Sequence, residues 1–121
     1  MMMRRAMATS GLFLCVALLA PVASAQRPVT EHPGQAIAFN NSRGNCLACH
    51  AMPTMPDAEQ PGNSGPPLIA MSARFPDKKV LRAQVWDPSV NHPNTFMPPF
   101  GKHKVLTEEE IDLVVDFVYG L

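Results

Sequence analysis

The sequence predicts a small all-α fold in which three to four helices are joined by long proline-rich loops. Two stretches, 76–86 and 107–121, carry apolar residues at helical spacing, and a shorter one at 34–41 can form a further helix. Most of the 13 prolines lie between Pro53 and Pro99, where they interrupt regular structure. A chain of 121 residues forms one domain, of a size that often depends on a covalent or bound group for stability.

Residues 45–50 read Asn-Cys-Leu-Ala-Cys-His, and a Cys-x-x-Cys-His run is typical of covalent haem c attachment. The thiols of Cys46 and Cys49 can each bond one vinyl group of a porphyrin, and His50 can then ligate the iron. Two alternatives exist for such a pair of cysteines. A zinc site needs a further Cys or His pair, and the only other cysteine is Cys15. A thioredoxin-like redox pair is expected near a βαβ pattern, which we do not find.

Residues 1–25 have the three parts of a secretory signal peptide. Two arginines stand at positions 4 and 5, an apolar run follows at 11–20, and Ala23-Ser24-Ala25 offers a small-residue cleavage site. The apolar run is short for a membrane span, and an uncleaved anchor is the alternative. We therefore expect export to the periplasm, where covalent haem attachment takes place in bacteria.

Cleavage after the leader predicts a mature domain of residues 26–121, whose first residues, 26–33, form a flexible arm. Loss of the two leader arginines leaves eight basic and ten acidic residues, a net charge of −2 before any haem propionates. This balance indicates no broad surface for nucleic acid or another polyanion.

The predicted helices have recognisable starts and faces. In the stretch 34–41, Gly34 and Ala38 lie four residues apart and form a small-residue notch that can admit a crossing helix. The C-terminal helix begins with a capping box, in which Thr107 is the N-cap and Glu110 follows three residues later. Four apolar residues then recur at helical spacing: Ile111, Val114, Val115 and Val118.

Six side chains are candidates for the second axial ligand of the iron: Met52, Met55, Met71, Met97, His92 and His103. The first two follow His50 too closely to round the ring edge, and Met71 is expected to pack. Met97 lies in a loop that two following prolines stiffen, so it is the favoured ligand. Either histidine would give bis-histidine iron instead. Histidine–methionine ligation raises the potential and favours electron transfer over oxygen chemistry.

Four segments resemble the SoxX family: GNCLACHAMP, PGNSGPPL, ARFPDKKVLRAQVWDP and, above all, MPPFGKHKVLTEEEIDLVVDFVYGL. SoxX proteins are the monohaem cytochrome subunits of the SoxAX complexes of thiosulfate-oxidising bacteria. The resemblance covers about residues 34–121 and implies a class I cytochrome c fold around one haem c. It also implies thioether bonds at Cys46 and Cys49, with His50 as the proximal and Met97 as the distal ligand.

The turn Gly65-Pro66-Pro67-Leu68 is similar to the Gly-Pro-x-Leu turn of small cytochromes c. In that family the proline carbonyl accepts the Nδ1–H of the proximal histidine, and the leucine packs on the haem. The resemblance thus implies that Pro66 orients His50 and that Leu68 contacts the cofactor. An ordinary turn is the alternative.

The resemblance further implies an electron-transfer subunit that is not itself catalytic. In SoxAX complexes (L-cysteine S-thiosulfotransferases) the SoxA subunit carries the catalytic haem, where thiosulfate is joined oxidatively to a cysteine of the SoxYZ carrier. The SoxX-like subunit accepts the electrons and passes them to a small cytochrome c. Alternatives are a free-standing class I cytochrome c, a haem enzyme or ligand sensor with Met97 unbound, and a structural protein without haem.

Overall fold

The computed structural model describes residues 32–121, so the predicted signal peptide and most of the predicted arm lie outside the described residues. Over this range the chain is helical, with no strand, so the predicted all-α fold is confirmed. The elements in order are α1 (Pro33–Phe39), η1 (Cys46–Ala48), α2 (Met71–Arg74), α3 (Lys78–Trp86), η2 (Pro88–Val90) and α4 (Glu108–Tyr119).

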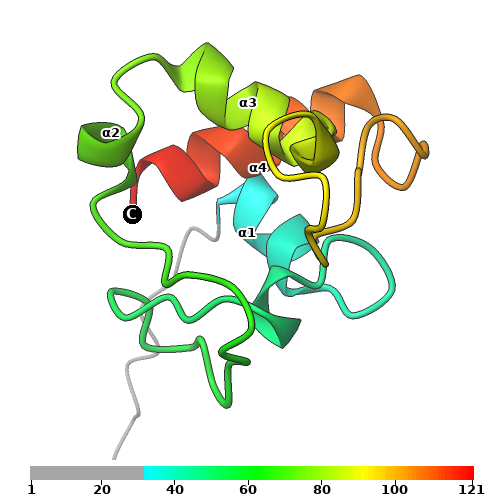
Figure 1. Ribbon diagram of the computed structural model, residues 1–121. Helices are drawn as coiled ribbons and strands as arrows, with labels where there is room; N and C mark the ends of the chain where they lie inside the picture. The colour runs from blue at the N-terminus through cyan, green and yellow to red at the C-terminus, as the bar shows by residue number, and fades with distance from the viewer. Residues whose placement is uncertain (1–31) are drawn as a thin grey trace, which may run out of the picture.

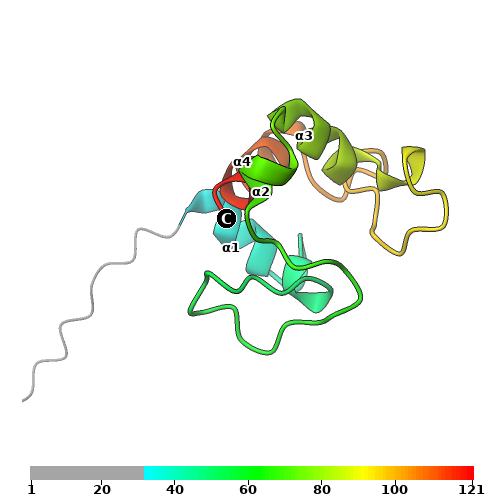
Figure 2. The same cartoon turned by 60° about the vertical axis from the view of Figure 1, so that its left-hand side comes forward.

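The first and last helices cross in the centre of the molecule (Figures 1 and 2). At the crossing, a Cβ atom on Gly34 would lie 2.0 Å from the carbonyl oxygen of Leu113 in α4. Ala38, one turn later on α1, is fully buried. The notch predicted from the sequence is therefore the surface through which α1 contacts α4.

Helix α1 begins one residue earlier than expected, because Pro33 occupies its first turn. The Nδ1 atom of His32 accepts a hydrogen bond from the Gly34 N–H at 3.0 Å, so His32 is the N-cap. Its ring also lies 5.9 Å, between centroids, from the ring of Phe117. The last two residues of the predicted arm thus belong to the start of α1.

The predicted capping box is present at the start of α4. The hydroxyl of Thr107 accepts from the Glu110 N–H at 3.2 Å, and the Glu110 carboxylate accepts from the Thr107 N–H at 3.0 Å. The apolar face of α4 then supplies much of the core: Ile111, Val114, Val115, Phe117 and Val118 are all buried.

Helix α3 packs against α4 and begins two residues later than expected. Asp77 is its N-cap, with the carboxylate accepting from the Lys79 N–H at 2.9 Å. Leu81 and Val85 are buried, whereas Val80 is 51% exposed, so the apolar face is narrower than the sequence pattern indicates.

Two long loops, 49–70 and 91–106, extend from this helical layer. In Figure 2 the green loop lies below α1, and the yellow-to-orange loop lies beyond the end of α3. The first loop is tied to α1 because the buried Gln35 donates from Nε2 to the Asp57 carboxylate at 2.6 Å. Within residues 32–121, no helix has the length and apolar character needed to cross a bilayer.

Candidate haem site

The Cys-x-x-Cys-His motif folds into a single tight turn around η1. Asn45, just before it, adopts a left-handed conformation with φ of 47°. The N–H groups of Cys49 and His50 both donate to the carbonyl of Cys46, at 3.2 and 2.9 Å. Both cysteines are partly buried, and neither forms a disulfide. The motif is therefore presented by one compact backbone segment.

The Cys46 thiol does not have the character of a redox-active thiolate. Burial raises its pKa to about 11, and the neighbouring Cys49 also raises it, against a backbone hydrogen bond that lowers it. Reactive cysteines of thioredoxin-like pairs have lowered pKa values instead. This difference counts against the redox-pair alternative.

The imidazole of His50 is held by the predicted turn. Its Nδ1 atom lies 2.6 Å from the carbonyl oxygen of Pro66. A carbonyl can only accept, so Nδ1 carries the proton and donates it, which leaves the lone pair of Nε2 free for a metal. The turn therefore selects the tautomer that a proximal haem ligand uses.

Two glycines allow this loop to lie directly on the motif. The Gly62 N–H donates to the Leu47 carbonyl at 2.8 Å, and the Gly65 N–H donates to the Cys49 carbonyl at 2.9 Å. A Cβ atom on Gly62 would lie 1.9 Å from the carbonyl oxygen of Ala48. On Gly65 it would lie 2.5 Å from Cε1 of His50. These roles were not predicted from the sequence, where two glycines in the proline-rich stretch PGNSGPP were the available signal.

The remaining predicted site residues lie on both long loops. Leu68 is buried, and its N–H donates to the Ala51 carbonyl at 2.8 Å. Met97 is partly buried, packs against the hydrophobic core, and donates its N–H to the hydroxyl of Thr95 at 3.1 Å. The structure thus brings His50 and Pro66 together, while the pairing of Met97 with His50 at one iron stays a prediction.

The other candidate ligands differ in accessibility. Met52 and Met71 are each only 2% exposed within the core, where their thioethers serve packing. His92 and His103 are exposed on the same loop as Met97. The burial of Met71 agrees with its expected packing role.

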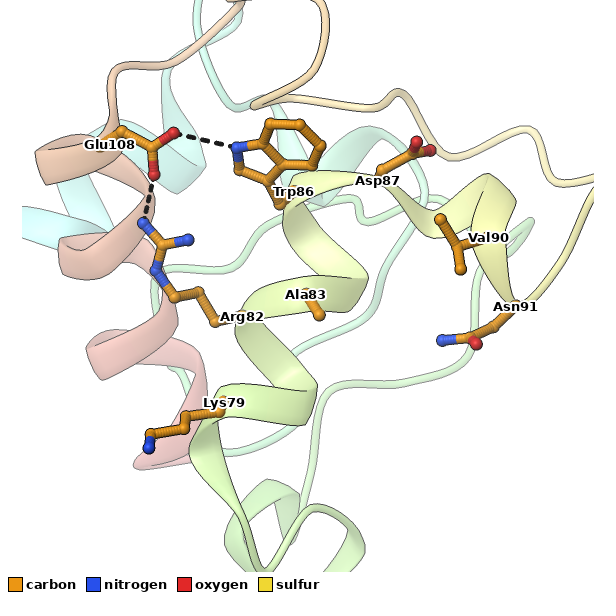
Figure 3. Close-up of a pocket in the computed structure, with 8 residues that line it drawn as sticks. All are labelled: Lys79, Arg82, Ala83, Trp86, Asp87, Val90, Asn91 and Glu108. Atoms are coloured by element: carbon orange, nitrogen blue, oxygen red, sulfur yellow. Dashed lines mark hydrogen bonds and ion pairs between the residues drawn. The ribbon is translucent and has the colours of Figure 1, made fainter.

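Among residues 32–121, no three or more His, Cys, Asp or Glu side chains gather closely enough to hold a metal ion. The described chain therefore offers no protein-only ligand set for zinc. An open surface pocket of about 470 Å³ lies elsewhere, between α3, η2 and the start of α4 (Figure 3). Its wall includes Trp86, whose indole N–H donates to Glu108 at 3.0 Å. None of the predicted haem-contacting residues lines this pocket.

The donor set around the motif fits a covalently attached haem. Cys46 and Cys49 supply two thiols at the correct spacing, and His50 supplies one free ring nitrogen. Gly65 leaves no side chain between the loop and the imidazole ring. These residues would hold the group by two thioether bonds and one axial bond.

Residues 32–118 match the family described as "Cytochrome C oxidase, cbb3-type, subunit III". The chain belongs to this family of c-type cytochromes, a class of proteins in which a covalently bound haem c serves electron transfer. The structure is also similar to the crystal structure of SoxXA from P. pantotrophus, with a TM-score of 0.66 and 29% identity. That match covers 78% of this chain and 82% of the other chain, so the chain is a SoxX-like cytochrome, and the predicted family and cytochrome c fold are confirmed.

A curated relative from Aquifex aeolicus (strain VF5), described as an uncharacterized lipoprotein, is 33% identical over 79 residues. The aligned region is 65% of this chain but only 37% of the relative, so the chain spans little more than a third of that protein's length.

Proposed function

We propose that this chain is the electron-transfer subunit of a SoxAX-type complex. The observation that carries the proposal is the structural match to SoxXA, which extends over most of both chains. The four SoxX-like sequence segments agree with it, since they cover parts of both long loops and all of α4.

Within the subunit, Cys46 and Cys49 would hold one haem c by thioether bonds, and His50 and Met97 would ligate its iron. Bound in this way, the haem supplies a one-electron iron couple of raised potential. The carbonyl of Pro66 keeps the proton on Nδ1 of His50, which fixes the ring orientation and would leave Nε2 for the iron. Leu68 packs beside the cofactor. With both residues bound, the iron would have no position open to a substrate.

The subunit accepts electrons from a SoxA-type cytochrome, with which it forms a heterodimer. Those electrons arise when a SoxYZ cysteine thiol and thiosulfate form an S–S bond, which releases one proton and two electrons. A small cytochrome c takes them onward. The leader, residues 1–25, directs the chain to the periplasm and is then removed, leaving 26–121 as the mature subunit.

Purification of the tagged chain from its native periplasm tests the assembly. We expect a second, larger c-type cytochrome to be recovered with it. A haem protein that elutes alone near its monomer mass in size-exclusion chromatography would instead identify a free-standing class I cytochrome c.

Haem attachment and ligation are tested on the isolated protein. The intact mass should equal residues 26–121 plus one haem, and a Cys46→Ser/Cys49→Ser variant should lose that added mass. The oxidised protein should absorb at about 695 nm, a band that reports iron–thioether bonding. Met97→Ala should abolish the band and admit carbon monoxide, whereas Met55→Ala, a control on the other long loop, should do neither. Retention of the band in Met97→Ala would disprove the assigned ligand.

A further inference from the structure

We propose that the C-terminal end of α3 clamps the loop 91–106, and that Trp86, Asp87 and Lys102 are positioning residues for the distal ligand Met97. The inference rests on the histidine–methionine ligation proposed above. It concerns residues that are not themselves expected to bind the iron.

The clamp begins at the backbone of Trp86. Its carbonyl oxygen accepts two hydrogen bonds from the loop, from the N–H groups of Gly101 at 3.1 Å and Lys102 at 3.2 Å. Gly101 lies against the indole ring so closely that a Cβ atom would be 2.0 Å from Trp86 Cδ1. The loop backbone is thereby fixed against one side chain of α3.

The indole ring is in turn fixed by α4. Its N–H donates to Glu108, and the same carboxylate pairs with Arg82 one turn earlier on α3 (Figure 3). Glu108 is the first residue of α4, which packs in the core. The ring against which the loop rests therefore belongs to the rigid helical layer.

An ion pair adds a second attachment. Lys102 Nζ lies 2.7 Å from the Asp87 carboxylate, whose side chain is only 6% exposed. The same carboxylate accepts from the Ser89 N–H at 3.1 Å. If the loop moved away, the buried Asp87 carboxylate would lose Lys102 as its cationic partner, and an unpaired buried charge is energetically costly. The pair therefore resists movement of the loop away from α3.

Buried side chains on both sides of Lys102 also hold the loop. Phe100 and Leu106 are buried in the core, and the Phe100 carbonyl accepts from the Leu106 N–H at 3.1 Å. Upstream, the hydrogen bonds are local: the Thr95 N–H donates to His92, and the Met97 N–H donates to Thr95. Met97 itself packs against the core, but the hydrogen bonds and the buried side chain that tie the loop to the helices come three to five residues after it.

This arrangement has a chemical consequence. A thioether is a soft, weakly held ligand. The fraction of iron that it occupies therefore depends on the fraction of time in which the loop holds the Met97 sulfur within bonding distance. If the loop opens more often, an external ligand competes with Met97 in proportion to the open population.

Two charge-equivalent variants of the haem-loaded mature protein test the inference. Lys102→Met removes the ion pair, whereas Lys104→Met removes the same charge from the same turn at an exposed residue. We expect Lys102→Met to bind imidazole about tenfold more tightly and to lose part of the 695 nm band. Lys104→Met should match the parent protein in both measurements.

Lys102→Arg keeps the cation, so its imidazole affinity and its 695 nm band should match those of the parent protein. Gly101→Ala should reproduce the effect of Lys102→Met because the new methyl group displaces the indole. Far-UV circular dichroism is followed alongside. Ligand exchange with an unchanged helical signal supports the clamp. The inference is overturned if Lys102→Met behaves like Lys104→Met, or if its band is lost only in step with unfolding. A parent protein without the band would refute the Met97 assignment itself.

Discussion

At the scale of single residues, the proximal half of the site depends on the absence of a side chain at Gly65. The glycine backbone lies against the His50 ring, and the next residue, Pro66, supplies the carbonyl that holds Nδ1. The proline side chain is exposed, so it contributes its backbone oxygen more than its ring.

We therefore predict that Gly65→Ala destabilises the holoprotein by about 1–3 kcal/mol, because the new methyl group overpacks the ring. Pro66→Ala keeps the carbonyl and should cost less than about 1 kcal/mol. Chemical denaturation with haem absorbance as the probe gives both values. Equal losses in the two variants would contradict this account.

The sequence could indicate Cys46, Cys49, His50 and Pro66 as candidate site residues because they lie within one short segment or a recognisable turn, and the structure brings His50 and Pro66 together. It did not reveal the contacts of Trp86 and Lys102. Their partners, Glu108 and Asp87, are 22 and 15 positions away, and only the fold brings such pairs together.

At the scale of elements, the crossing of α1 and α4 determines how closely the first and last helices pack against each other. Gly34 faces a backbone carbonyl of α4, which cannot move as a side chain can. We predict that Gly34→Ala separates the helices and lowers the free energy of unfolding by about 3 kcal/mol.

Gly120→Ala is the matched control for this change. Gly120 has a φ of −80°, and its nearest neighbour would lie 3.4 Å from a new Cβ, so the same methyl group is accommodated. Its effect on thermal or urea unfolding should be within about 1 kcal/mol of zero. A Gly34→Ala protein as stable as Gly120→Ala would show that the crossing is not tightly packed.

The sequence predicted those helices that have a capping motif or a recognisable packing face. Thr107 and Glu110 marked the start of α4, and Gly34 marked the notch on α1. Helix α2, residues Met71–Arg74, was missed because four residues carry no periodic pattern and its preceding residue, Ala70, is left-handed. The conformations of the two long loops could not be predicted either, because they depend on contacts with distant segments.

At the scale of the whole molecule, three carboxylates connect stability to acid pH. Lys102 lowers the pKa of Asp87, Arg82 lowers that of Glu108, and the Thr107 N–H lowers that of Glu110. A carboxylate whose pKa is lower in the folded than in the unfolded state stabilises the protein at pH values above its unfolded-state pKa. That stabilisation is lost as the pH falls through the folded-state pKa.

We accordingly predict that the free energy of unfolding is nearly constant above about pH 5 and falls as the pH is lowered towards 3. Glu110→Gln preserves the capping box but not the charge, so its stability should fall less over this interval. Urea unfolding across the range measures both curves. Parallel curves for the variant and the parent would show that Glu110 does not contribute.

The close approach of Gly62 and Gly65 to the motif has a consequence for biogenesis. Once the loop 49–70 has folded, its backbone covers the turn that carries both thiols. We expect the thioether attachment proposed above to require access to Cys46 and Cys49 before this loop closes.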